Sequence, residues 1–169
     1  LDMLPNGAIN VDEYMRTSDK DVMAAGDCCS VFFNPTREHM YIPLATNAVR
    51  MGTLAAINIV ENKIKHPGTQ GTSGIKIYEN NMASTGITEE IAKQLGIDAD
   101  FVYAVDNYRP EFMPTYEKVT LKVVFEKESR RILGAQLTSK ADLTQSINTI
   151  SVCIQNNMTI DQLAFVDFF

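Results

Sequence analysis

The residues best suited to chemistry lie in two short segments of the N-terminal half. An apolar run ends at Gly26, and Asp27 comes directly after this glycine. Because glycine has no side chain, a ligand can approach the backbone closely there. A carboxylate in this place can accept hydrogen bonds from ligand hydroxyls. The second segment, residues 43–46, is the predicted start of a helix, where unpaired N–H groups and the helix dipole favour negative charge. A Gly-Asp pair after an apolar run is also an ordinary strand-ending turn, and that alternative stays open at Asp27.

Cysteine and histidine provide no further reactive cluster. Cys28 and Cys29 are adjacent, and neighbouring cysteines rarely form an unstrained disulfide. Cys153 lies on a predicted helix and is expected to be a small buried residue. The odd count of three cysteines fits reduced thiols in the cytosol better than a disulfide framework. His39 and His66 have no acid or thiol cluster at metal-ligand spacing, so no metal site is predicted.

Composition excludes several classes of function. The 169 residues carry 15 Lys and Arg against 21 Asp and Glu, a net charge of -6, so no basic field is available to hold nucleic acid. The longest apolar stretches fall short of the roughly 20 residues needed to cross a bilayer. The N-terminus also lacks the residue order of a signal peptide. We therefore expect a cytoplasmic protein without nucleic-acid or membrane partners.

The N-terminal half is predicted to contain two strands and a helix. Alternation over residues 7–12 and an apolar run over residues 21–27 each indicate a strand, the second one buried on both faces as in an α/β sheet. Residues 43–61 have helical periodicity, with Pro43 near the first turn. The face expected to pack on the sheet consists of Ala45, Ala48, Val49, Gly52, Ala55, Ala56 and Ile59.

A change in composition between Glu61 and Gly74 marks a domain boundary. The segment holds lysines, a proline and three glycines, which is typical of a linker. We therefore predict one domain over residues 1–70 and a second over residues 71–169.

The C-terminal half reads as an antiparallel sheet with helices on one face, an α+β fold. Strands are expected at residues 75–79, 101–106, 119–126 and 132–138, the last two joined as a hairpin by a polar turn. A short helix is predicted after Thr88, which is a candidate N-cap, and a longer one over residues 143–154. Capping-box spacing is found at Asp142 and Gln145 and again at Thr159 and Gln162.

Residues 17–28 and 43–52 together resemble the second FAD-binding stretch of the pyridine nucleotide-disulfide oxidoreductases. Residues 118–122 and 132–136 are similar to the C-terminal dimerisation domain of the same family. The resemblance covers essentially the whole chain. It is strongest to the branch of the NADH oxidases, NADH peroxidases and coenzyme A-disulfide reductases, and most of all to the water-forming NADH oxidases.

The resemblance implies the end of a split α/β FAD-binding domain followed by a dimerisation domain. It implies that Asp27 holds the ribityl chain of FAD and that Leu44, Ala45 and Thr46 touch the isoalloxazine ring. In the intact enzyme, hydride would pass from NADH to FAD, and the reduced flavin together with a redox cysteine would reduce dioxygen to water. The implied partner is a second copy of the chain, in a homodimer.

The resemblance also suggests residues that face the partner's active site. Tyr108 lies in a loop comparable to one whose tyrosine has that role in the coenzyme A-disulfide reductases, and ordinary packing is the alternative. Phe168 and Phe169 resemble the start of an aromatic segment that faces the partner's flavin.

Several family features are missing from this sequence. It contains no Gly-x-Gly-x-x-Gly fingerprint and no match to the family's redox cysteine, so no catalytic residue is assigned and the chain alone is expected to be inactive. The ends at Leu1 and Phe169 lead us to expect a piece of a longer protein, with a processed protein as the alternative. NADH peroxidase, coenzyme A-disulfide reductase and a non-catalytic self-associating module remain alternative functions.

Overall fold

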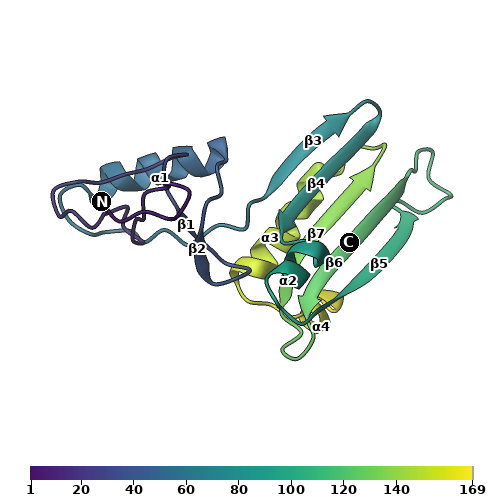
Figure 1. Ribbon diagram of the computed structural model, residues 1–169. Coiled ribbons are helices and arrows are strands. Elements are labelled where there is room, and N and C mark those ends of the chain that lie inside the picture. The colour runs from purple at the N-terminus through teal and green to yellow at the C-terminus, as the bar shows by residue number, and fades with distance from the viewer. Residues whose placement is uncertain (169) are drawn as a thin grey trace. The chain divides into compact units, whose positions relative to one another are not determined.

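The computed structural model describes residues 1–168 and divides the chain into two compact units. Unit 1 spans Leu1–Gly71 and unit 2 spans Thr72–Phe169. Figure 1 shows an irregular N-terminal segment beside one helix in unit 1 and a broad sheet with short helices in unit 2. Each unit is described separately below.

Regular structure in unit 1 is limited to one hairpin and one helix. Strand β1 (Val31–Phe33) pairs with β2 (Glu38–Met40), and helix α1 spans Ala45–Asn58. The predicted strands at residues 7–12 and 21–27 are wrong: their backbone makes only isolated bridges, at Ile9 and at Met23. A strand needs a neighbour along its length, and each of these segments finds one at only one or two residues.

Helix α1 is present as predicted, but it buries a different face. Asn47, Met51 and Asn58 are buried, whereas Val49 is 71% exposed and Ile59 is 68% exposed. The polar members of the buried face are held by hydrogen bonds, among them one from the Lys63 backbone N–H to the Asn58 carboxamide at 2.9 Å. Met51 packs in an apolar cluster with Val11, Met15 and Cys29.

Unit 2 is built on a five-stranded antiparallel sheet of order β3-β4-β7-β6-β5. The strands are β3 (Ser73–Ile77), β4 (Asn80–Gly86), β5 (Ala99–Asn107), β6 (Lys118–Glu126) and β7 (Ile132–Ser139). The predicted hairpin of the last two strands is confirmed, with Phe125 opposite Ile132 beside a register shift. Strand β4 was not predicted, since its small polar residues have low strand propensity and its place depends on pairing with both β3 and β7.

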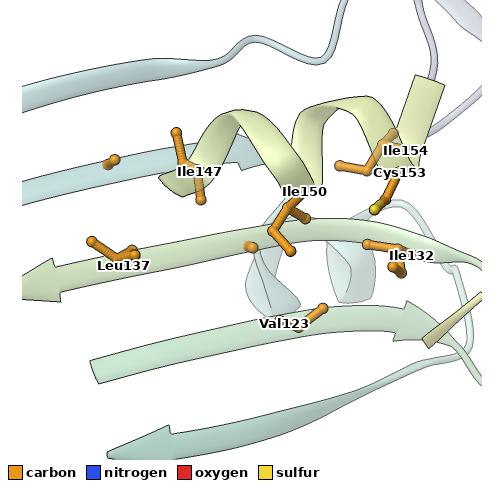
Figure 2. Packing of buried hydrophobic residues seen from close by; sticks show 9 residues of the cluster. Val123, Ile132, Leu137, Ile147, Ile150, Cys153 and Ile154 are labelled. Atoms are coloured by element: carbon orange, nitrogen blue, oxygen red, sulfur yellow. The ribbon is translucent and has the colours of Figure 1, made fainter. Parts of the chain in front are cut away.

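Helix α3 (Ile147–Gln155) covers one face of this sheet and forms the core of unit 2. Figure 2 shows Ile150 and Cys153 on α3 directed at the strands, with Leu137 and Val123 below them. Burial of these aliphatic side chains, at roughly 25 cal/mol per Å² of apolar area, is the main stabilising contribution in this unit. The predicted antiparallel α+β fold is therefore confirmed.

The remaining helices of unit 2 are short. Helix α2 (Glu89–Gln94) begins at the predicted N-cap Thr88, whose hydroxyl accepts a hydrogen bond from the Ile91 N–H. Glu89 on α2 pairs with Lys122 at 2.6 Å. Because Lys122 is next to Val123, whose side chain faces α3, alternation places the ion pair at the opposite face of the sheet.

The two capping boxes predicted from spacing have different outcomes. Thr159 caps helix α4 (Ile160–Ala164) in the predicted box with Gln162. The box at Asp142 is wrong, because Asp142 instead accepts hydrogen bonds from the backbone and hydroxyl of Thr144. This contact starts the 3₁₀ turn η1 (Thr144–Ser146), and α3 begins only after it.

Candidate flavin half-site

Asp27 lies in a tight turn that closes from Gly26 to Cys29. The Cys29 backbone N–H donates to the Gly26 carbonyl at 3.0 Å, and Gly26 has φ of 92°, a conformation that favours glycine. Asp27 is exposed, and within residues 1–168 its carboxylate makes no hydrogen bond or ion pair. The turn therefore presents an open acceptor to solvent.

The N-terminus of α1 presents donors instead of acceptors. Leu44 is the N-cap in an extended conformation, and no side chain caps the helix there. The Asn47 and Ala48 N–H groups donate to the Leu44 carbonyl at 2.8 and 2.9 Å, which leaves the N–H groups of Ala45 and Thr46 without a backbone partner among the described residues. No acidic residue occupies the first turn, so the positive end of the helix dipole is not neutralised.

The Asp27 turn and the first turn of α1 are neighbours. A Cβ placed on Gly26 would lie 3.7 Å from the Ala48 Cβ, so the two segments meet in van der Waals contact. An exposed carboxylate and an uncapped helix N-terminus therefore lie on adjoining segments of unit 1. We call this arrangement, made of Asp27 and the helix start at Leu44, Ala45 and Thr46, the half-site.

Asn47, in the first turn of α1, is held by hydrogen bonds next to the half-site. The sequence did not predict this role for Asn47. Its side-chain oxygen accepts a hydrogen bond from the Thr69 hydroxyl at 3.1 Å and another from the Arg50 guanidinium at 2.7 Å. Asn47 is buried, and its side-chain nitrogen has no partner in the described structure. The spacing of Asn47, Met51 and Asn58 along one helical face is the signal that could have revealed it.

The candidates for the partner's active site all belong to unit 2. Tyr108 is half-buried, its N–H donates to the Glu117 carbonyl at 3.0 Å, and the Arg109 guanidinium lies 5.0 Å from its ring centre. These contacts fix the loop between β5 and β6. Phe168 is 59% exposed, and Phe169 lies outside the described residues.

Histidine and cysteine form no metal centre within residues 1–168, where no group of three or more metal-ligating side chains occurs. His39 is exposed and stacks edge-on against Phe32. His66 is buried, and its Nδ1 accepts a hydrogen bond from the Gly68 N–H at 3.1 Å. Burial, and to a lesser degree the Arg50 charge, lower the pKa of His66.

The cysteines are all free thiols. Burial raises the pKa of Cys153 and, together with the neighbouring Cys28 thiol, raises that of Cys29 to about 12. Neither thiol is activated as a nucleophile. Among the described helices, none has both the length and the apolar character that a membrane span requires.

Two family models match the chain. Residues 72–168 match the dimerisation domain of the pyridine nucleotide-disulphide oxidoreductases, and residues 1–52 match a second model of pyridine nucleotide-disulphide oxidoreductases. The dimerisation-domain match begins at residue 72, which is also the first residue of the second compact unit.

Relatives with known names agree with these matches. The NADH oxidase of Enterococcus faecalis is 54% identical over the whole chain, which spans 38% of that protein. A solved structure of the water-forming NADH oxidase from Lactobacillus brevis, bound to NADH, is also 54% identical, with a TM-score of 0.97 over 99% of this chain and 37% of that one. A NAD-dependent persulfide reductase from A. fulgidus is 35% identical, with a TM-score of 0.93 over 99% of this chain and 31% of that one.

The chain thus spans less than two fifths of the length of the named NADH oxidases that it resembles. Its dimerisation-domain match alone covers more than half of its residues. The chain belongs to the pyridine nucleotide-disulphide oxidoreductase family.

Proposed function

We propose that the chain is the C-terminal part of an FAD-dependent NADH oxidase, in which it supplies part of the flavin site and the dimer interface. The likeness to NADH oxidases along the whole chain supports the activity. The structural observation that carries the proposal is the contact between Gly26 and Ala48, which brings the turn that holds Asp27 against the first turn of α1, whose N-terminus no side chain caps.

The residues of the half-site fit FAD. Asp27 is an exposed carboxylate with no protein partner in residues 1–168, so it is free to accept hydrogen bonds from ribityl hydroxyls. The N–H groups at Ala45 and Thr46 are available to the electron-rich pyrimidine edge of the ring system, and Leu44 supplies an apolar surface next to them. When bound, FAD supplies the chemistry of accepting hydride from NADH and passing electrons to dioxygen.

Of the two domains predicted from the sequence, residues 1–70 are assigned as the end of a split FAD-binding domain and residues 71–169 as the dimerisation domain. The two family matches and the division into compact units support this assignment. In the proposed homodimer, Tyr108 and Phe168 face the partner's flavin site. The odd number of cysteines, which does not suit a disulfide framework, supports a cytoplasmic location.

A chimera tests the proposed activity. The segment of Enterococcus faecalis NADH oxidase that matches this chain is replaced by residues 1–169. The chimera is expected to purify with bound FAD and to consume NADH with dioxygen without releasing hydrogen peroxide. A chimera that folds and binds FAD but consumes NADH only when given peroxide or a disulfide would overturn the oxidase assignment.

Substitutions in the chimera test the half-site itself. Asp27→Ala removes a charge-assisted acceptor and should weaken FAD retention by roughly tenfold or more. Asp21→Ala, which removes another exposed carboxylate of the same segment, should leave the flavin content unchanged. Equal flavin content in both variants after gel filtration would reject the role of Asp27.

A further inference from the structure

Cys28 and Cys29 hold their sulfur atoms side by side, although the two residues are adjacent in the sequence. The two Sγ atoms are 3.6 Å apart. Successive side chains in an extended strand point to opposite faces, so this proximity comes from the turn that begins at Gly26. The pair is a dithiol, and neither cysteine is in a disulfide.

Backbone hydrogen bonds fix this arrangement before any ligand binds. The Cys29 N–H donates to the Gly26 carbonyl at 3.0 Å, and the Ile9 N–H donates to the Cys28 carbonyl at 2.9 Å. The Ser30 N–H returns a bond to the Ile9 carbonyl, also at 2.9 Å. Because the main chain on both sides of the pair is held, a ligand that bridges the sulfurs needs little reorganisation of the protein.

The two thiols differ in access. Cys28 is exposed, and its Sγ lies 3.5 Å from the Ala25 carbonyl oxygen. Cys29 is 3% exposed and packs against Met15 and Met51. A reagent in solution can therefore reach the Cys28 sulfur. Once bound there, it lies next to the buried Cys29 sulfur, which can act as the second ligand.

We propose that Cys28 and Cys29 form a dithiol site that binds a trivalent organoarsenical through both sulfur atoms. Trivalent arsenic is soft and forms stable bonds to two thiolate ligands at once, whereas one thiol alone is readily exchanged. This proposal is separate from the flavin half-site and does not depend on it.

The reaction requires no oxidant or reductant. The hydrated reagent carries two hydroxyl groups on arsenic. The Cys28 sulfur forms the first As–S bond and one hydroxyl leaves as water with the Cys28 proton. The Cys29 sulfur then forms the second bond, and its proton leaves with the other hydroxyl as a second water, so arsenic stays trivalent throughout.

The order of the two steps follows from the environment of the buried thiol. Burial and the neighbouring Cys28 raise the pKa of Cys29 to about 12, so it holds its proton at neutral pH. It therefore reacts poorly with a reagent in solution and well with an arsenic atom already bonded to the adjacent sulfur, where the reaction is intramolecular.

Phenylarsine oxide is the probe for the test. After one equivalent is added to the reduced 169-residue protein, intact-mass analysis should show one phenylarsenic group bound in place of two hydrogens. The adduct should survive an excess of a monothiol and be removed by 2,3-dimercaptopropanol. An adduct that the monothiol removes from the wild-type protein would overturn the proposal.

Substitutions locate the site. Cys28→Ser alters only an exposed side chain and should reduce the monothiol-resistant adduct at least tenfold. Cys153→Ser changes the remaining cysteine, in the core of unit 2, and should leave the adduct intact. Retention of the resistant adduct by Cys28→Ser, with circular dichroism unchanged, would also contradict the proposal. Loss of the adduct in Cys153→Ser with the fold unchanged would contradict it equally.

Discussion

Gly134 on β7 pairs with Gly86 on β4. Strand β4 ends at Gly86, and the chain leaves the sheet there. A Cβ on Gly134 would lie 2.0 Å from the Ile87 carbonyl oxygen, and a Cβ on Gly86 would lie 2.0 Å from the Leu133 carbonyl oxygen. The Ile87 N–H donates to that same Leu133 carbonyl at 3.0 Å. The crossing from β4 to α2 thus depends on two backbones in direct contact, with no space for a side chain between them.

The first prediction is that Gly134→Ala strongly destabilises unit 2. The new methyl group would clash with backbone atoms, which cannot move aside as a flexible side chain can, so we expect a loss of about 3 kcal/mol in the free energy of unfolding. Urea denaturation followed by circular dichroism measures it. Gly52→Ala is the matched control, because a Cβ at Gly52 meets nothing within 4 Å and the helix should gain about 0.5–1 kcal/mol. Equal stability of the two variants would contradict this account.

A second prediction concerns the cap of α4. Thr159→Ala removes the hydroxyl that accepts the Gln162 N–H at 3.2 Å and should cost about 1 kcal/mol of unfolding free energy. Thr53→Ala removes a hydroxyl that donates back to the Val49 carbonyl within α1, where it caps nothing. Because alanine is the better helix former, that control should be neutral or slightly stabilising. Thermal unfolding of the two variants distinguishes the outcomes, and an unaffected Thr159→Ala protein would show that the box contributes nothing.

The third prediction is a loss of stability in mild acid caused by His66. Its pKa in the folded protein is lowered, chiefly by burial, from an unfolded value of about 6.5. The unfolded chain therefore binds the proton more readily, so the contribution of neutral His66 is fully present above about pH 6.5 and is lost as the pH falls below it. The hydrogen bond that Nδ1 accepts from Gly68 also requires the neutral ring.

The measurement is urea denaturation between about pH 5 and 7, a range that spans the unfolded histidine pKa. His66→Gln should flatten the dependence of unfolding free energy on pH, whereas His39→Gln, at an exposed histidine, should retain the wild-type slope. A slope that persists in His66→Gln would assign the acid sensitivity to other groups.

Local patterns predicted the parts of the fold whose stability is local. The alternation of β6 and β7 and the Thr159 box are encoded by neighbouring residues, and both are present. Strand β4 escaped prediction because its position depends on two partner strands distant in sequence. The buried face of α1 was misjudged for a related reason: Asn58 is buried because loop backbone groups bond to its carboxamide, which hydrophobicity does not report.

The candidate site was also predicted only in part from local sequence patterns. Sequence motifs pointed to Asp27 and to the start of α1 separately, as a carboxylate after a glycine and as a helix N-terminus. Their adjacency rests on the Gly26 contact with Ala48, and the support from Asn47 rests on Thr69. Neither contact has a signature in local composition, so a structure was needed to relate the two motifs.

The last prediction concerns self-association through the sheet of unit 2. On the face turned away from α3, Ile75 is 60% exposed, Tyr103 is 60% exposed and Val105 is 48% exposed. Ile75 lies on β3 and the other two on β5, so apolar side chains are exposed at both edges of this face, as is typical of a surface that a partner covers. We therefore expect the isolated chain to form a dimer, and Ile75→Lys combined with Tyr103→Lys to raise its dissociation constant at least tenfold, since charge would then be buried in the contact. Light scattering over a concentration series measures this change.

Val60→Lys places the same charge at an 88% exposed residue of unit 1 and should leave the dimer intact. A wild-type chain that stays monomeric at tens of micromolar, or a double variant that dimerises as tightly as the control, would show that this face is not the contact.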